Sequence, residues 1–135
     1  MAFKFEKLEV WQLGMELTSK VYSLIKTMPE SEKFNLSSQI RRAATSVPLN
    51  IAEGSTSQTD PEQLRFLGYA HRSLMEVVSC FMLMKEHKFI DDTKYQELYS
   101  FSEKLSAKIL AMRKAIKANS KNNRVNDETE NYNID

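Results

Sequence analysis

Apolar residues recur at steps of three and four positions in four long segments, and this spacing constrains the fold most. The segments run from about Leu8 to Met28, Leu36 to Glu53, Asp60 to between His87 and Phe89, and Asp91–Thr93 to Ala118. Such spacing places apolar side chains on one face of an α-helix, whereas a half-buried strand needs alternation. The sequence therefore predicts four amphipathic helices.

Each predicted helix carries one apolar stripe that would face a common core. The stripes are Val10, Leu17, Val21, Leu24 and Met28; Leu36, Ile40, Ala43, Ala44, Val47 and Ile51; Leu67, Ala70, Leu74, Val77, Val78, Phe81 and Met84; and Leu98, Leu105, Ile109, Met112 and Ile116. Only three glycines and three prolines occur in 135 residues, which argues against a strand-and-turn fold. Because short connections join antiparallel neighbours, we expect an all-α, antiparallel up-down-up-down four-helix bundle over residues 1–118.

Residues 119–135 differ from this body in composition. They include six asparagines and offer almost nothing to bury, so we expect a disordered polar tail. The single cysteine, Cys80, excludes an intramolecular disulfide and fits a reducing compartment. No apolar run has the length of a signal peptide or a membrane span. We therefore predict a cytoplasmic protein.

Local signals mark two of the helix ends. Asp60 is a good N-cap, Pro61 suits the first helical position, and Gln63 completes a capping box. Gly54 follows the second stripe and is expected to act as the C-cap of that helix.

Pro48 lies inside the second stripe, where a proline costs a helix about 3 kcal/mol. The stripe nevertheless keeps its phase across the proline, which favours one kinked helix over two. A helical wheel places Gln39, Ser46, Asn50 and Glu53 on one flank, Arg41, Thr45, Pro48 and Ala52 on the other, and Arg42 outward. We expect the polar flank to be structural and the small residues of the other flank to permit a close neighbour.

Apolar residues also occur away from the core stripes. They are Trp11, Met15 and Tyr22 (with Thr18) in the first helix, Met75 and Leu83 in the third, and Tyr99 and Leu110 in the fourth. A contiguous exposed row of this kind usually marks a partner, so we predict self-association through Trp11, Met15 and Tyr22. The alternative is a slightly rotated first helix in which Trp11 packs inside.

The sequence offers little for catalysis. His71, His87 and Cys80 do not have metal-ligand spacing, and no phosphate-binding loop is present. Arg65 followed by His71 resembles a pattern of some helical-bundle ribonucleases, but positions six apart lie about 120° apart on a helix. We expect no enzymatic activity, no metal, no cofactor and no small-molecule substrate, and keep a ribonuclease as a distant alternative.

The basic residues suggest a different role. Lys114, Lys117 and Lys121 form a ridge on the fourth helix with Arg113 at its edge, and Arg65, Tyr69 and Arg72 share the outer face of the third. Basic and aromatic side chains together are compatible with contacts to phosphates and bases. The alternative is a solvated face whose lysines complement the helix dipole.

One segment is specific for a family. FNLSSQIRRAATSVPLNIAEGS resembles the signature of the bacterial four-helix-bundle proteins named for intervening sequences of large-subunit ribosomal RNA genes. FEKLEVWQLGMEL resembles the family's opening, and Ser73-Leu74, Glu76 and Lys88–Ile90 resemble its later part. The resemblance covers about residues 3–115. Its signature positions here are Gln39, Arg41, Arg42, Pro48, Asn50, Glu53 and Gly54, which we interpret as structural.

The resemblance implies a homopentameric ring without established enzymatic activity. The related accessory variability proteins of diversity-generating retroelements act as adaptors for a reverse transcriptase and its RNA through a basic surface. This implies a scaffold or adaptor that contacts RNA or a nucleic-acid-handling protein. The alternative is a purely structural or protein-binding ring without a nucleic-acid role.

Overall fold

The computed structural model describes the backbone of residues 2–132 and the side chains of residues 2–123. Four α-helices and two short 3-10 helices make up the described chain, which contains no strand, so the all-α prediction is confirmed. The elements are η1 (Lys4–Lys7), α1 (Glu9–Ile25), η2 (Glu30–Glu32), α2 (Leu36–Ser55), α3 (Asp60–Glu86) and α4 (Asp92–Tyr132).

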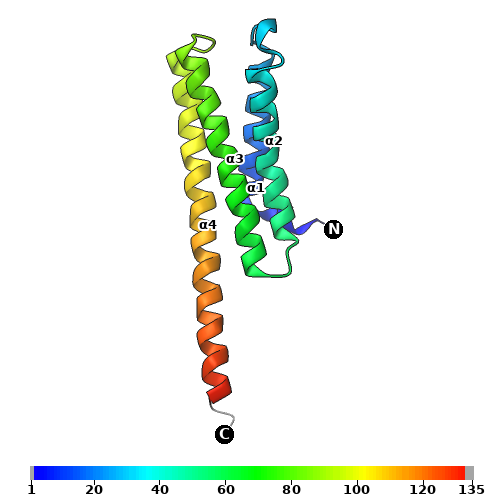
Figure 1. Cartoon of the computed structure of the whole chain (residues 1–135), viewed down its shortest axis with the longest axis vertical. Coiled ribbons are helices and arrows are strands. Elements are labelled where there is room, and N and C mark those ends of the chain that lie inside the picture. The colour runs from blue at the N-terminus through cyan, green and yellow to red at the C-terminus, as the bar shows by residue number, and fades with distance from the viewer. Residues whose placement is uncertain (1, 133–135) are drawn as a thin grey trace.

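Successive helices run in opposite directions along the long axis of the molecule (Figure 1). Within the described chain, the backbone of α1 contacts those of α2 and α4, and the backbone of α3 contacts the same two helices. No such contact joins α1 to α3 or α2 to α4 in this part of the chain. The two pairs α1–α3 and α2–α4 are therefore the diagonals of the bundle.

The core forms along the predicted stripes. Leu17, Val47, Leu74 and Leu105 are fully buried, and all but four of the predicted stripe residues are in the core. Met28, Val78, Met112 and Ile116 are partly buried and pack against it, and Leu13, Cys80 and Tyr95 also belong to the core. Helical periodicity thus predicts nearly all of the core, because burial in a bundle follows the face of each helix.

The start of α3 differs from the prediction by one residue. Thr59, not Asp60, is the N-cap: its backbone is extended (φ −129°, ψ 150°), and its hydroxyl accepts a hydrogen bond from the Glu62 amide. Asp60 and Pro61 lie in the first turn. Thr59 and Glu62 have the spacing of a capping box, and this register replaces the one predicted from Asp60 and Gln63.

Gly54 is not a C-cap but a buried residue within α2, and the helix ends at Ser55 with Thr56 as its cap. A Cβ atom on Gly54 would lie 3.0 Å from Phe66 Cβ on α3 and 3.4 Å from the Gln63 carbonyl oxygen. The prediction was wrong because the reason for this glycine is tertiary: it lets α2 and α3 approach closely.

Pro48 is buried inside α2, and the helix continues through it as one element, as predicted. The bend at Pro48 stays a prediction. On the neighbouring helix α1, a Cβ atom on Gly14 would lie 3.3 Å from Pro48 Cβ. The small flank of α2 therefore does permit a close neighbour, and that neighbour is α1.

The turn between α3 and α4 is a Schellman motif. Lys88 has a left-handed backbone (φ 62°), the Phe89 amide donates to the Met84 carbonyl at 2.8 Å, and the Lys88 amide donates to the Lys85 carbonyl at 3.0 Å. These bonds satisfy carbonyls that the end of α3 leaves free. Asp91 then caps α4, accepting the Lys94 amide at 2.7 Å.

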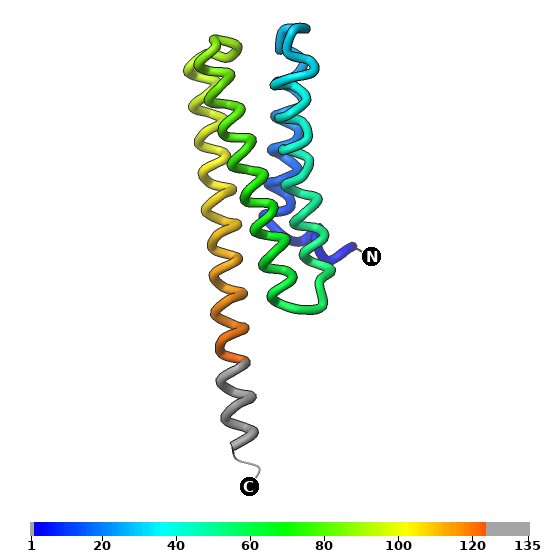
Figure 2. The backbone as a smooth tube through the Cα atoms, viewed as in Figure 1, coloured from blue at the N-terminus to red at the C-terminus, as the bar shows by residue number. Residues whose placement is uncertain are grey.

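Two helix lengths differ from the predictions. α1 ends at Ile25 rather than Met28, and α4 continues past Ala118 to Tyr132. Figure 2 shows α4 extending beyond the connection between α2 and α3. Nothing interrupts α4, since the sequence has no glycine or proline after Gly68. The predicted disorder of residues 119–135 stays a prediction, and 133–135 lie outside the described residues.

No helix in the described chain is both long enough and apolar enough to cross a membrane.

Candidate interaction surfaces

The basic ridge consists of Lys114, Lys117 and Lys121, whose side chains are all exposed on α4. Among the described residues none of the three forms an ion pair. Lys117 and Lys121 border a shallow depression beside Pro61 and Leu64, near the start of α3. The three ammonium groups are thus available to a partner.

Arg113, predicted with this ridge, has a different position. Its side chain is half-buried, and its Nε donates to the Leu64 carbonyl oxygen on α3 at 3.3 Å. A Cβ atom on Gly68 would lie 3.6 Å from the guanidinium, so that glycine leaves room beside it. Arg113 therefore joins α4 to α3, and its guanidinium is partly occupied.

The structure brings the predicted residues Arg65, Tyr69 and Arg72 together with Phe66 on α3. The Phe66 and Tyr69 rings meet edge to face at 5.8 Å, Arg65 lies 5.6 Å from the centre of the Phe66 ring, and Arg72 lies 6.0 Å from that of Tyr69. The exposed carboxylate of Glu76 belongs to the same helix face. This face is therefore mixed in charge and suits a polyanion less than the basic ridge does.

The predicted oligomer residues of α1 differ in exposure. Met15 is 44% exposed and Tyr22 is 46% exposed. Trp11 is only half-buried, packs against the core, and has its ring 5.0 Å from that of Phe5. Met15 and Tyr22 are available to a partner. Trp11 instead packs partly against the core, which was the alternative to its lying in an interface.

A second set of exposed apolar side chains lies on α3 and α4. Met75, Leu83 and Leu110 are exposed as predicted, whereas Tyr99 is half-buried against the ring of Tyr95. Met82 on α3 and Leu49 on α2 are also exposed, by 47% and 68%, and were not predicted. Their positions on the helical wheel, away from the core stripes, were the signal that could have found them.

The signature segment holds a polar network between α2 and α3. The Ser46 and Ser73 hydroxyl oxygens lie 2.8 Å apart, and Asn50 Nδ2 donates to both the carbonyl and the hydroxyl oxygen of Ser46. Asn50 is thus held structurally. Gln39, Arg42 and Glu53 have exposed side chains, and Arg41 is half-buried. Arg42, Asn50 and Glu53 line a surface groove with Leu49 and Phe66.

His71 connects α3 to α4 through a hydrogen bond of 2.8 Å between its Nε2 and the Ser106 hydroxyl oxygen. Burial, and then the charge of Arg113, lower the pKa of His71. Arg65 instead lies over Phe66, so the two residues of the ribonuclease-like pattern have different partners. The lowered pKa favours the neutral imidazole. His71 is therefore interpreted as a packing residue between α3 and α4.

Cys80 is buried, and burial followed by the charge of Glu76 raises the pKa of its thiol. A protonated, buried thiol is a poor nucleophile and a poor metal ligand. Within the described residues, no three histidine, cysteine, aspartate or glutamate side chains are grouped so as to hold a metal ion.

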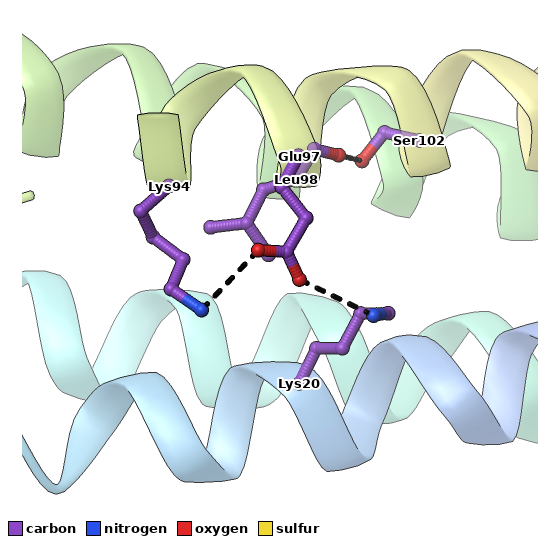
Figure 3. Close-up of polar contacts among 5 residues, drawn as sticks. All are labelled: Lys20, Lys94, Glu97, Leu98 and Ser102. Atoms are coloured by element: carbon purple, nitrogen blue, oxygen red, sulfur yellow. Dashed lines mark hydrogen bonds and ion pairs between the residues drawn. The ribbon is translucent and has the colours of Figure 1, made fainter. Parts of the chain in front are cut away.

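Charged side chains lie across the groove between α1 and α4 (Figure 3). Glu97 of α4 lies 3.6 Å from Lys20 of α1 and 3.5 Å from Lys94 of its own helix. Lys20 also lies 5.1 Å from the centre of the Phe101 ring. Exposed pairs of this kind contribute at most about 1 kcal/mol each. Of the two, the Lys20–Glu97 pair joins α1 to α4, whereas the Lys94–Glu97 pair lies within α4.

Residues 6–111 match the family described as 23S rRNA-intervening sequence protein. The chain belongs to this family. A solved structure of a protein with unknown function from the S23 ribosomal protein family of Bacteroides thetaiotaomicron has the same fold, with a TM-score of 0.73. It is 23% identical to the chain, and the match covers 78% of this chain and 98% of that one. None of the curated proteins compared with this chain matches it significantly.

Proposed function

We propose that this chain is a non-enzymatic, homo-oligomeric scaffold or adaptor that contacts RNA or a nucleic-acid-handling protein. The observation that carries the proposal is the exposure of large apolar side chains on two diagonal helices of the bundle. Met15 and Tyr22 of α1 and Met75, Met82 and Leu83 of α3 are each more than 40% exposed.

The diagonal placement favours head-to-tail assembly. Because α1 and α3 do not contact one another, their outer faces point to opposite sides of the bundle. One copy can then offer α1 to α3 of the next copy, and a repeated contact of this heterologous kind closes into a ring when the rotation permits. The family resemblance implies that five copies close the ring. We propose a cytoplasmic location because the single cysteine fits a reducing compartment.

The basic ridge supports contact with RNA. Lys114 and Lys121 are separated by about 10 Å along α4, at about 1.5 Å per residue. Three lysines on one monomer give weak binding, but the ridge repeats in every copy of an oligomer, and the phosphate contacts of one RNA then add. Arg65, Tyr69 and Arg72 are a secondary contact because Glu76 shares their face.

A gel shift with a structured RNA tests the nucleic-acid part of the proposal. Triple reversal of the basic ridge (Lys114→Glu, Lys117→Glu and Lys121→Glu) should abolish binding. Reversal of three exposed lysines elsewhere, Lys4→Glu, Lys7→Glu and Lys33→Glu, is the matched control and should retain most of it. A plot of the logarithm of the affinity against the logarithm of the salt concentration should be linear. Its slope should be about −2 or steeper for each basic ridge that contacts the RNA.

The second candidate is a structural or protein-binding ring without a nucleic-acid role. The surface groove beside Leu49 and Phe66 favours it, because an exposed leucine next to an aromatic ring suits a protein partner. An oligomer that binds no RNA at low salt would support this candidate and remove the RNA contact from the proposal.

A further inference from the structure

The helix α2 presents an outward row of side chains that the proposed head-to-tail contact, between α1 and α3, leaves uncovered. We call Arg42, Leu49 and Glu53, which are all exposed, the α2 row. At about 100° per residue, their positions lie within about 40° of one another around the helix. Leu49 is 68% exposed. One exposed leucine is common on protein surfaces, so the charges and the groove beside it decide what it does.

The charges of the α2 row are self-complementary. α2 has three charged side chains, Arg41, Arg42 and Glu53, of which Arg41 is half-buried. Among the described residues neither Arg42 nor Glu53 forms an ion pair. The two positions are about 17 Å apart along the helix axis, on either side of Leu49. A second α2 running antiparallel would therefore place its Glu53 at Arg42 and its Arg42 at Glu53.

The surface groove beside the row has room for the leucine of a second copy. Its lining includes Arg42, Thr45, Ser46 and Leu49. Four positions with this spacing form the hole that receives one side chain when two helices pack. In the register that pairs Arg42 with Glu53 of the other copy, the two-fold axis crosses α2 midway between these positions. Leu49 of each copy then lies opposite Ser46 of the other, in the hole, so the apolar contact and the charge pairing require the same register.

We propose that α2 pairs with α2 of a second copy of this chain about a two-fold axis, with Leu49 in the groove of the other copy and Arg42 facing Glu53 at both ends. Such a contact is isologous, because each copy contributes the same residues. The pair is additional to the proposed function: α1 and α3 build the oligomer, and α2 joins one oligomer to another. Exposed ion pairs add little free energy, so the pair forms at high protein concentration and does not set the size of the oligomer in dilute solution.

Covalent trapping tests the pair, because it captures weak contacts between chains. Leu49→Cys places the two thiols about 4.5 Å apart along the helix direction, close to the two-fold axis. Gln39→Cys, exposed on the same helix, is the matched control, since its thiols would lie about 26 Å apart in that direction. The buried Cys80 is present in both variants. Reaction with a short bismaleimide, followed by denaturing electrophoresis, measures the rate of dimer formation.

Leu49→Cys should crosslink at least about ten-fold faster than Gln39→Cys, because pairing raises the effective concentration of its thiols. Addition of either Arg42→Glu or Glu53→Arg should slow the crosslinking of Leu49→Cys about three- to ten-fold, because each change places like charges opposite one another. The two charge changes together restore opposite charges. They should return the rate to within about two-fold of that of Leu49→Cys alone.

Equal rates for Leu49→Cys and Gln39→Cys would overturn the proposal and leave the groove to a different protein. A double charge variant as slow as the single ones would also overturn it, because the contact would then not depend on complementary charges. The result is separate from the head-to-tail assembly. Charge-dependent trapping in a chain that scatters light as a monomer in dilute solution would support the α2 pair and remove the ring.

Discussion

At the residue scale, Lys88 is the one residue of the described backbone with a left-handed conformation. Its left-handed backbone lets the Schellman motif form, and that motif directs the chain from α3 into α4. A residue with a Cβ atom disfavours this conformation, whereas glycine adopts it at no steric cost.

Lys88→Gly should therefore raise the free energy of unfolding by about 0.5–1 kcal/mol. Lys104→Gly, at an exposed position within α4, is the matched control and should lower it by about 1 kcal/mol. Urea denaturation followed by circular dichroism measures both. A loss of stability in both variants would show that the left-handed conformation at Lys88 is not costly.

His71 links stability to pH. Its pKa in the folded chain is lowered from 6.5 by burial and by Arg113. As the pH falls through 6.5 toward that lowered value, the unfolded chain gains a proton that the folded chain does not, so the free energy of unfolding decreases. Above pH 6.5 both states are neutral, and the effect is absent.

Replacing His71→Gln should remove this contribution. We expect wild-type stability to fall more steeply than that of the variant between pH 7.5 and pH 5.5, as measured by urea midpoints. The exposed His87 is present in both chains and cancels in the comparison. Parallel pH profiles would contradict the placement of His71 between α3 and α4.

At the scale of the element, two glycines test how the helices approach one another. Gly54 of α2 faces Phe66 Cβ and the Gln63 backbone, whereas Gly68 of α3 faces only the flexible end of Arg113. A methyl group added at Gly54 should clash with α3, whereas one added at Gly68 should fit without a clash.

Gly54→Ala should lower the free energy of unfolding by about 1 kcal/mol, because overpacking of 1–3 kcal/mol exceeds the gain in helix propensity. Gly68→Ala should raise it by up to about 1 kcal/mol, because propensity acts there without a clash. Thermal unfolding of the two variants shows whether each substitution raises or lowers the stability. Stabilisation by Gly54→Ala would mean that α2 and α3 are further apart than described.

Sequence periodicity predicts the helices and their buried faces, since a residue such as Leu17 or Leu74 is buried by its place on the stripe alone. It does not predict contacts between distant positions. The roles of Gly54 and Arg113 depend on Phe66 and Leu64, which lie on another helix. The start of α3 was ambiguous because Thr59–Glu62 and Asp60–Gln63 both have capping-box spacing, and only the backbone geometry decides between them.

At the scale of the whole molecule, one bundle offers two unpartnered apolar faces and one basic ridge. The faces lie on the diagonal helices α1 and α3, so a single contact cannot bury both within a pair of copies. A head-to-tail ring buries both and repeats the ridge around its axis. We therefore expect the same assembly to account for both oligomerisation and RNA binding.

Multi-angle light scattering of the 135-residue chain tests the head-to-tail assembly most directly. We expect a single species several times the 15.6 kDa chain mass, with five copies as the number that the family resemblance implies. Met15→Glu combined with Tyr22→Glu should reduce it to the monomer without loss of helix content, whereas Lys4→Glu with Lys7→Glu should not. A wild-type chain that scatters as a monomer at high micromolar concentration would contradict the account.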